Sequence, residues 1–149
     1  MNAVTWFVVL LVWTLQAPTP LVSTVCELES SPQRYAGKMV QVRATVVGRK
    51  KLTIFDFATA GCVGQLPVVF PDAIRPMPDF NLEKDETFQK LQKALRERTE
   101  IEATFEGRFD YPVQDRMTRR NASGMRMPMR LVLRKVSNLD VTTTRSVDR

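Results

Sequence analysis

The sequence predicts a mainly β fold, namely a small barrel of five strands with a helix between the third and fourth strands and a short helix at the N-terminal end. Three observations lead to this prediction. Apolar and polar residues alternate in several short segments, which is typical of half-buried strands. One longer segment has apolar residues at helical spacing. Pro, Gly and Asp separate these segments and mark turns between them.

Residues 1–23 have the pattern of a cleavable signal peptide. Nearly every residue from Trp6 to Leu15 is apolar, and the run has about the length of a signal-peptide core, roughly 7 to 15 residues, too short to cross a bilayer. Pro18 is a poor residue to follow a scissile bond, so we expect cleavage after Ser23, with Leu21 and Ser23 as the recognised residues. The sequence therefore predicts export, to the periplasm or out of the cell.

The rest of the chain forms one predicted domain, residues 24–141, followed by a flexible tail, residues 142–149. About 125 residues are enough for one hydrophobic core. Cys26 could suggest a lipoprotein, but Val25 is larger than the small residue that lipid attachment normally needs before the cysteine. We do not expect a lipid anchor.

The exported domain has two cysteines and a basic charge. Cys26 and Cys62 both follow the expected cleavage site, and an even cysteine count in an exported protein favours a disulfide over a metal pair or a reactive thiol. Two separate buried thiols are the alternative. All acidic and basic side chains also follow the cleavage site, so the domain keeps the full net charge of +6.

A short helix and a long strand are expected first. Thr24 and Glu27 have the spacing of a capping box, which predicts a helix from Val25 to Ser30. Pro32 ends this helix, and a turn at residues 35–38 leads into the strand. One face of that strand is apolar and includes Val40, Val42, Ala44 and Val46.

Four further strands follow from the same alternation, and they are expected at residues 52–56, 66–70, 101–106 and 129–141. A helix is predicted between about Leu82 and Arg98, with an apolar face that comprises Phe88, Leu91, Ala94 and Leu95. Gly107 is expected to bend the fourth strand, and residues 137–139 break the alternation of the last one.

Three strands, a helix and two strands form the element order of an OB-fold, provided that the first strand bends and serves two sheets. Closing such a barrel also removes the exposed sheet edges that a small β domain must protect. A generic α+β sandwich accounts for the same elements and remains the alternative.

The start of the domain resembles a group of small, uncharacterised secreted bacterial proteins. The resemblance rests on Cys26-Glu27-Leu28, Pro32, Tyr35, Gly37-Lys38, Val40, Val42-Arg43 and a later cysteine, here Cys62. More distantly, the Gly-Lys turn and Phe105-Glu106-Gly107 look like OB-fold modules of the tRNA-anticodon-like family. Members usually have Gly where this chain has Ala44. The resemblance implies the fold and export, and implies no activity.

Catalytic residues are sparse. The chain has no histidine, which is the commonest general base and a common metal ligand. The carboxylates between residues 83 and 102 lie on or beside a helix whose solvent face needs charge. No nucleophile elbow, Walker motif or dinucleotide-binding glycine pattern is present. We therefore expect a non-enzymatic protein without a cofactor.

Basic side chains concentrate in two loops that an OB-fold brings to the same end of the barrel, and OB-folds use these loops to bind oligonucleotides and oligosaccharides. The candidate ligand-binding residues are Arg49, Lys50, Lys51, Arg116, Arg119, Arg120, Arg126 and Arg130, with Tyr111 as a stacking partner. Few aromatic residues are left for stacking bases, and export also disfavours nucleic acid. An anionic envelope glycan, a lipid headgroup or an acidic protein surface suits the compartment better. The alternative is that these arginines only solvate a long loop.

Two other functions remain open. One is Cu(I) binding through four methionines, because thioether sulfur is a soft copper ligand; these are Met117, Met125, Met127 and Met129. Alternating methionines that enter a strand are more often core residues. The other function is a scaffold whose surface contacts another protein.

Overall fold

The computed structural model describes residues 18–47, 52–57, 59–73, 80–97, 100–113 and 128–142. The expected signal-peptide core and most of the expected tail lie outside these ranges. The strands are β1 (Leu21–Ser23), β2 (Met39–Val47), β3 (Thr53–Asp56), β4 (Gly64–Val69), β5 (Glu100–Asp110) and β6 (Arg130–Thr142). The helices are α1 (Val25–Ser30), α2 (Pro32–Tyr35) and α3 (Glu86–Arg96), with a 3-10 turn, η1 (Pro71–Ala73). No helix in the described ranges is long and apolar enough to cross a membrane.

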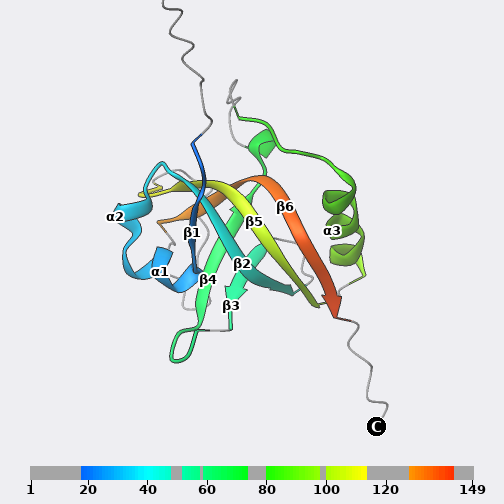
Figure 1. Cartoon of the computed structure of the whole chain (residues 1–149), viewed down its shortest axis with the longest axis horizontal. Helices are drawn as coiled ribbons and strands as arrows, with labels where there is room; N and C mark the ends of the chain where they lie inside the picture. The colour runs from blue at the N-terminus through cyan, green and yellow to red at the C-terminus, as the bar shows by residue number, and fades with distance from the viewer. Residues whose placement is uncertain are drawn as a thin grey trace, which may run out of the picture.

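The described strands confirm the OB-like barrel (Figure 1). They follow the order β1-β2-β3-β4-β6-β5, and β2 also pairs with β5, so β2 to β6 close into a five-stranded barrel. β2 pairs with β5 along its whole length, and with β1 and then β3 on its other side. The first barrel strand thus pairs with β3 on one side and with β5 on the other, so that it serves both halves of the barrel, as expected for an OB-fold, and the α+β sandwich is excluded.

Barrel closure shifts the register of the strands. Hydrogen-bonded neighbours lead around the barrel from Lys38 through Phe109, Leu131 and Val68 to Leu52. From Leu52, β3 runs back along the C-terminal end of β2, where Ile54 pairs with Val46. One turn around the barrel from Lys38, which precedes β2, therefore ends beside the C-terminal end of β2. This offset along the strand is the shear of the barrel. It tilts the strands and gives the barrel an interior that side chains fill.

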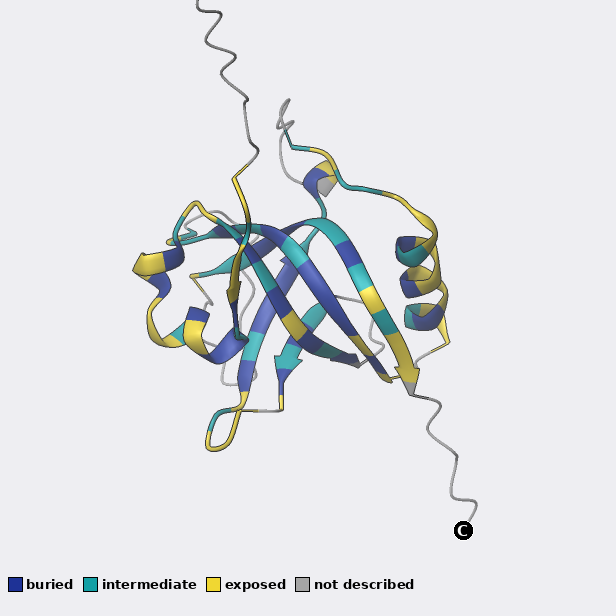
Figure 2. Cartoon of the chain, viewed as in Figure 1, coloured by how far each residue is buried: buried dark blue, intermediate teal, exposed yellow. Residues whose placement is uncertain are grey.

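The core forms where the expected alternation points inward (Figure 2). Val40, Val42, Ala44 and Val46 on β2 are all buried, as predicted. Phe105 and Phe109 on β5 contribute the largest fully buried side chains. Gly107, between them, approaches β6 so closely that a Cβ atom would collide with the Val132 carbonyl group. The expected bend in this strand coincides with a register shift between β5 and β6 at residues 106 and 107.

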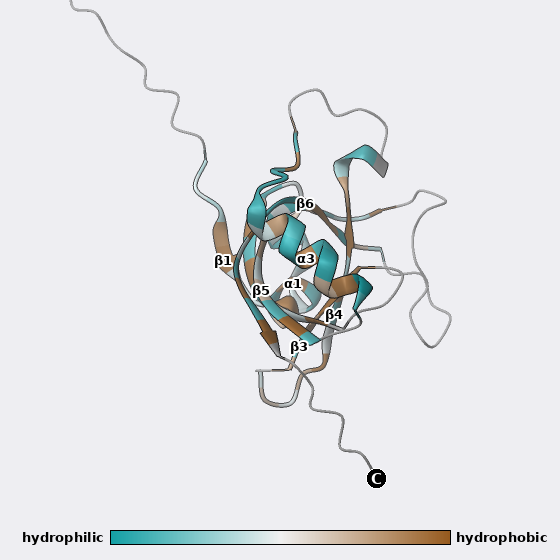
Figure 3. Ribbon diagram, turned by 90° about the vertical axis from the view of Figure 1, so that its right-hand side faces the viewer, coloured by the Kyte–Doolittle hydropathy of each residue, from teal (hydrophilic) through white to brown (hydrophobic). Residues whose placement is uncertain are grey.

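Helix α3 covers one end of the barrel, while α1 lies toward the other end (Figures 1 and 3). The buried face of α3 includes Phe88, Leu91 and Ala94, as predicted. The helix starts later than the expected Leu82, because Asp85 accepts a hydrogen bond from the Phe88 amide at 2.9 Å and so acts as the N-cap. The preceding segment is extended, and the Glu83 amide donates to the Arg134 carbonyl on β6 at 2.7 Å.

The capping box predicts α1 correctly. Thr24 Oγ1 accepts from the Glu27 amide at 3.1 Å, and Glu27 Oε2 accepts from the Thr24 amide at 3.0 Å. Pro32 does follow the end of α1, as predicted, but the second short helix, α2, between this proline and the expected turn at residues 35–38 was not expected. Pro32 is the first residue of α2, a position where its missing amide hydrogen is not needed and its fixed φ is already helical.

An additional strand, β1, was not expected. Leu21–Ser23 runs parallel to β2, with Leu21 opposite Val40 and Ser23 opposite Val42. The sequence analysis includes these residues in the signal peptide, because Leu21 and Ser23 fit the residues recognised before a cleaved bond.

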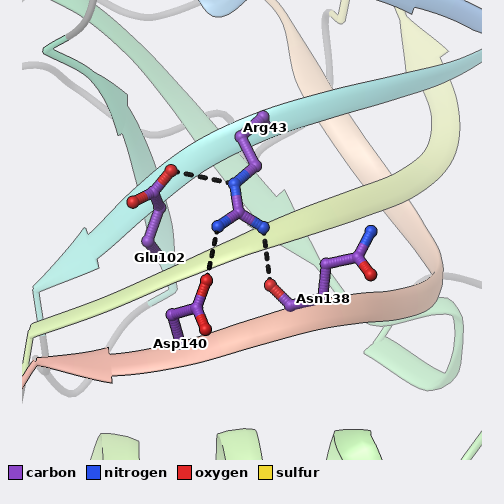
Figure 4. Close-up of polar contacts among 4 residues, drawn as sticks. All are labelled: Arg43, Glu102, Asn138 and Asp140. Atoms are coloured by element: carbon purple, nitrogen blue, oxygen red, sulfur yellow. Dashed lines mark hydrogen bonds and ion pairs between the residues drawn. The ribbon is translucent and has the colours of Figure 1, made fainter.

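A bulge in β6 lies where the alternation breaks. Asn138 has a positive φ of 49°, and the β5–β6 register shifts between residues 102 and 104. Arg43 on β2 reaches across β5 to this point (Figure 4). Its guanidinium donates to Glu102 at 2.8 Å, to the Asn138 carbonyl at 2.6 Å and to Asp140 at 2.7 Å. One side chain thus connects three strands on the outer wall.

The disulfide between Cys26 and Cys62 is present, which excludes two separate thiols. It joins buried α1 to the β3–β4 connection, with the two Cα atoms 6.3 Å apart. Gly64 lies beside it, and a Cβ atom there would be 2.9 Å from Val25 Cγ1 and 3.0 Å from Cys26 Sγ. The absence of a side chain at this position lets α1 pack directly on the start of β4.

We predict that the double variant Cys26→Ala/Cys62→Ala folds but loses about 3 to 4 kcal/mol of stability, because the bridge closes a loop of 36 residues in the unfolded chain. Urea unfolding of the oxidised wild type, the reduced wild type and the variant measures this loss. The two forms without the bridge should agree. An unfolding midpoint equal to that of the oxidised protein would contradict the prediction.

Candidate functional site

The expected ligand-binding residues lie mainly in two segments outside the described ranges. Residues 48–51 connect β2 to β3, and residues 114–127 belong to the connection between β5 and β6. We name these segments the first and second basic loops. They contain Arg49, Lys50, Lys51, Arg116, Arg119, Arg120 and Arg126, whose role as ligand contacts stays a prediction.

The described residues that follow the two basic loops flank the same strand. Leu52, directly after the first loop, accepts a hydrogen bond through its carbonyl from the Val68 amide of β4 at 3.0 Å. On the other side of β4, Val68 pairs with Leu131 near the start of β6, three residues after the described Pro128. The residues that follow the two basic loops therefore lie on opposite sides of the C-terminal part of β4, as the expected OB topology requires.

The two basic loops carry the whole charge surplus of the chain. Residues 48–51 have a formal charge of +3, and residues 114–127 also have +3, which together equal the net charge of +6. The remainder of the chain is formally neutral. Charged side chains on the described barrel wall form local ion pairs, such as Arg43 with Glu102 and Asp140 and Lys135 with Glu83. Hydrogen bonding to Asp140 and then to Glu102 raises the pKa of Arg43.

Arg130, at the base of the second basic loop, belongs to a small ion cluster. Asp110 accepts from Arg108 Nε at 2.6 Å and from Arg130 Nε at 3.2 Å. The Arg130 side chain is 13% exposed and that of Asp110 is 16% exposed. The Arg108 guanidinium also lies 5.7 Å from the centre of the Phe80 ring. Two guanidinium groups around one carboxylate thus hold together the strand ends from which the second loop emerges.

Two other expected site residues pack inward. Tyr111 and Met129 are both partly buried and contact the hydrophobic core. The remaining expected copper ligands, Met117, Met125 and Met127, lie outside the described ranges. Among the residues described, no cluster of three His, Cys, Asp or Glu side chains could hold a metal ion.

A pair of phenylalanines at the C-terminal end of β3 is a feature that the sequence analysis missed, since it left few aromatic residues for stacking. The Phe55 and Phe57 rings stack with their centres 5.7 Å apart and an angle of 7° between their planes. Phe57 is 59% exposed, and Val63, which follows the loop of the β3–β4 hairpin, is 76% exposed. The signal was present, because buried Ile54 and Asp56 alternate with Phe55 and Phe57 and place both rings on the outer face.

Polar side chains border this aromatic pair. Phe55 lies between Thr45 on β2 and Gln65 on β4 in the strand register. Glu29 of α1 reaches the same strand and accepts a hydrogen bond from the Gln65 amide at 2.7 Å. The outer face of β3 thus combines flat apolar rings with groups that can exchange hydrogen bonds.

Two carboxylates of α1 have pKa values shifted in opposite directions. Partial burial raises the pKa of Glu29, the bond from the Gln65 amide opposes this rise, and Asp56 adds to it. Glu27 is exposed. The hydrogen bond from the Thr24 amide lowers its pKa, and the bond from the Ser23 hydroxyl lowers it further.

A separate open cleft of about 320 Å³ lies between η1 and α3. Its floor contains the edge-to-face ring pair Phe70 and Phe88, with centres 5.8 Å apart. The ion pair of Lys84 with Asp72, at 3.3 Å, forms part of its rim. Tyr111 and Arg130, the expected ligand-binding residues within the described ranges, do not line this cleft.

Comparison of the chain with protein-family models, with curated proteins and with solved structures finds no match. The resemblance to small secreted bacterial proteins and to the tRNA-anticodon-like modules therefore stays a prediction. Function has to be inferred from the residues of this chain.

We predict that Glu27→Gln and Glu29→Gln change the pH dependence of stability in opposite ways. The lowered pKa of Glu27 stabilises the fold above the unfolded value near 4.5, and this contribution is lost as pH falls through the folded pKa. The raised pKa of Glu29 favours the fold below that value, and this contribution is lost as pH rises through the folded pKa.

At pH 7, Glu27→Gln should therefore be less stable than the wild type. Glu29→Gln should be at least as stable, because its amide oxygen can still accept from Gln65. Both differences should shrink by pH 3, and thermal unfolding at the two pH values measures them. The same sign of change for both variants at pH 7 would contradict the assignment.

Proposed function

We propose that this protein is an exported, non-enzymatic module that binds a polyanionic glycan of the cell envelope. The ligand would contact the two basic loops and the outer face of β3 and β4 between them. The observation that supports this proposal best is the charge distribution. The whole surplus of +6 falls in two loops, and the residues that follow these loops flank Val68 from opposite sides.

Such a distribution favours an extended anion over a small one. A concentration of formal positive charge in two loops of an otherwise formally neutral chain attracts a polyanion by long-range steering and by release of its counterions. The loops of an OB barrel that are equivalent in topology to these two are known to bind oligosaccharides and oligonucleotides. Export of the protein favours the oligosaccharide.

The aromatic pair on β3 supports a glycan as the ligand. Phe57 presents an exposed ring that can pack against the apolar face of a sugar. Thr45 and Gln65, on either side of Phe55, can exchange hydrogen bonds with sugar hydroxyls. The first basic loop leads directly into this strand, so a chain bound to its cations would pass the rings.

We predict that the triple variant Arg116→Ala/Arg119→Ala/Arg120→Ala binds heparin, used as a sulfated glycan probe, at least about tenfold more weakly than the wild type, a loss of about 1.4 kcal/mol. The dependence of binding on salt should also become shallower, because fewer counterions are released. Titration at several salt concentrations measures both effects.

The matched control is Lys90→Ala/Lys93→Ala/Arg96→Ala, which removes the same charge from the solvent face of α3. It should bind heparin within about twofold of the wild type. Equal losses in the two triple variants would show that only the net charge matters and would refute the proposed site. Binding to anionic lipid vesicles without binding to heparin would refute a glycan ligand.

We also predict that Phe57→Ala weakens heparin binding several-fold while its melting temperature stays within about 2 °C of the wild type, since the side chain is mostly exposed. Val141→Ala removes an exposed apolar side chain from the end of β6 and should leave binding unchanged. Binding that is unaffected by Phe57→Ala would remove the aromatic pair from the site.

A further inference from the structure

The expected leader cleavage and the observed fold disagree about residues 21–23. Cleavage after Ser23 would release Leu21–Ser23 together with the leader. In the structure these residues are β1, paired with Val40, Gln41 and Val42 of β2. The expected signal peptide therefore includes a strand of the folded domain.

Strand β1 occupies an edge that no other described strand covers. β3 pairs with β2 only at Thr45 and Val46, toward the C-terminal end of that strand. The N-terminal half of β2 is paired with β5 on one side and with β1 on the other. Loss of β1 would leave an open edge of backbone amide and carbonyl groups, which small β proteins normally protect.

Ser23 also helps to build the start of α1. Its side chain is buried, with the residue 6% exposed, and its hydroxyl donates to Glu27 Oε2 at 2.9 Å. The same carboxylate accepts from the Thr24 amide. Cleavage after Ser23 would remove the first donor. It would also convert the Thr24 amide into an ammonium group at the helix N-terminus, where positive charge is unfavourable.

Helix α1 is not dispensable for the domain. It buries Val25 and Leu28 in the core, and Cys26 forms the disulfide to Cys62. A disturbed start of α1 would therefore affect the packing of the helix on β4, where Gly64 leaves no spare room.

We propose that the leader is cleaved before Leu21, so that β1 is the first element of the mature domain. This inference rests on the export that is part of the proposed function. In this reaction a leader peptidase hydrolyses one peptide bond. Water supplies the hydroxyl of the new carboxylate on the leader and the proton of the new amino terminus on the domain.

The test uses the full-length chain with a C-terminal affinity tag, expressed in a bacterium and recovered from the periplasmic and cytoplasmic fractions. Intact-mass spectrometry and N-terminal sequencing identify the first residue. The variant Ser23→Val is analysed in parallel, because Val is too large for the residue before a cleaved bond and is a favourable residue in a strand.

We expect the periplasmic protein to begin at Leu21 or earlier in both the wild type and Ser23→Val. A wild-type protein that begins at Val22 or later would overturn the inference while leaving export intact. A Ser23→Val precursor that stays uncleaved would overturn it as well. Intact chain found only in the cytoplasm would instead overturn export and, with it, the proposed envelope ligand.

Discussion

The double pairing of Val68 is the constraint on which the rest of the structure depends. Its amide bonds to the Leu52 carbonyl on one side of β4, and its backbone pairs with Leu131 on the other. This parallel contact between β4 and β6, together with the antiparallel pairing of β2 with β5, closes the barrel, since the other barrel pairs join strands that follow one another in the chain. Closure fixes the shear, and the shear determines which loop ends lie together. The proposed ligand site is therefore a consequence of barrel closure.

The ends of the barrel are covered by helices that are held in different ways. α3 is held by its apolar face and by the Asp85 cap. α1 is too short to be stable alone, and several contacts fix it to the β3–β4 hairpin. These are the disulfide, the close approach of Gly64 and the bond from Gln65 to Glu29. Because the hairpin also carries the stacked pair of Phe55 and exposed Phe57, these contacts keep the outer face of β3 in place.

Charge is organised in two ways in this molecule. On the described barrel wall, arginines such as Arg43 and Arg130 bond to carboxylates on neighbouring strands and connect them. The surplus cations lie in the two basic loops. A protein that needed positive charge only for solubility would not need to concentrate it in this way. The separation of paired wall charges from unbalanced loop charges supports a binding role for the loops.

The sequence by itself determined most of the local structure. Alternation identified the barrel strands and the inward residues of β2, the capping box identified α1, and the two cysteines indicated the disulfide, because these signals depend on neighbouring residues or on simple counts. The tertiary structure decided what depends on distant partners. β1 is a strand only because β2 offers it an edge, Arg130 is largely buried because Asp110 lies on the adjacent strand, and Phe57 is exposed because closure places that face of β3 outside. The proposed leader boundary rests on this second group, since cleavage signals are read along the chain whereas the pairing of β1 with β2 is a contact across it.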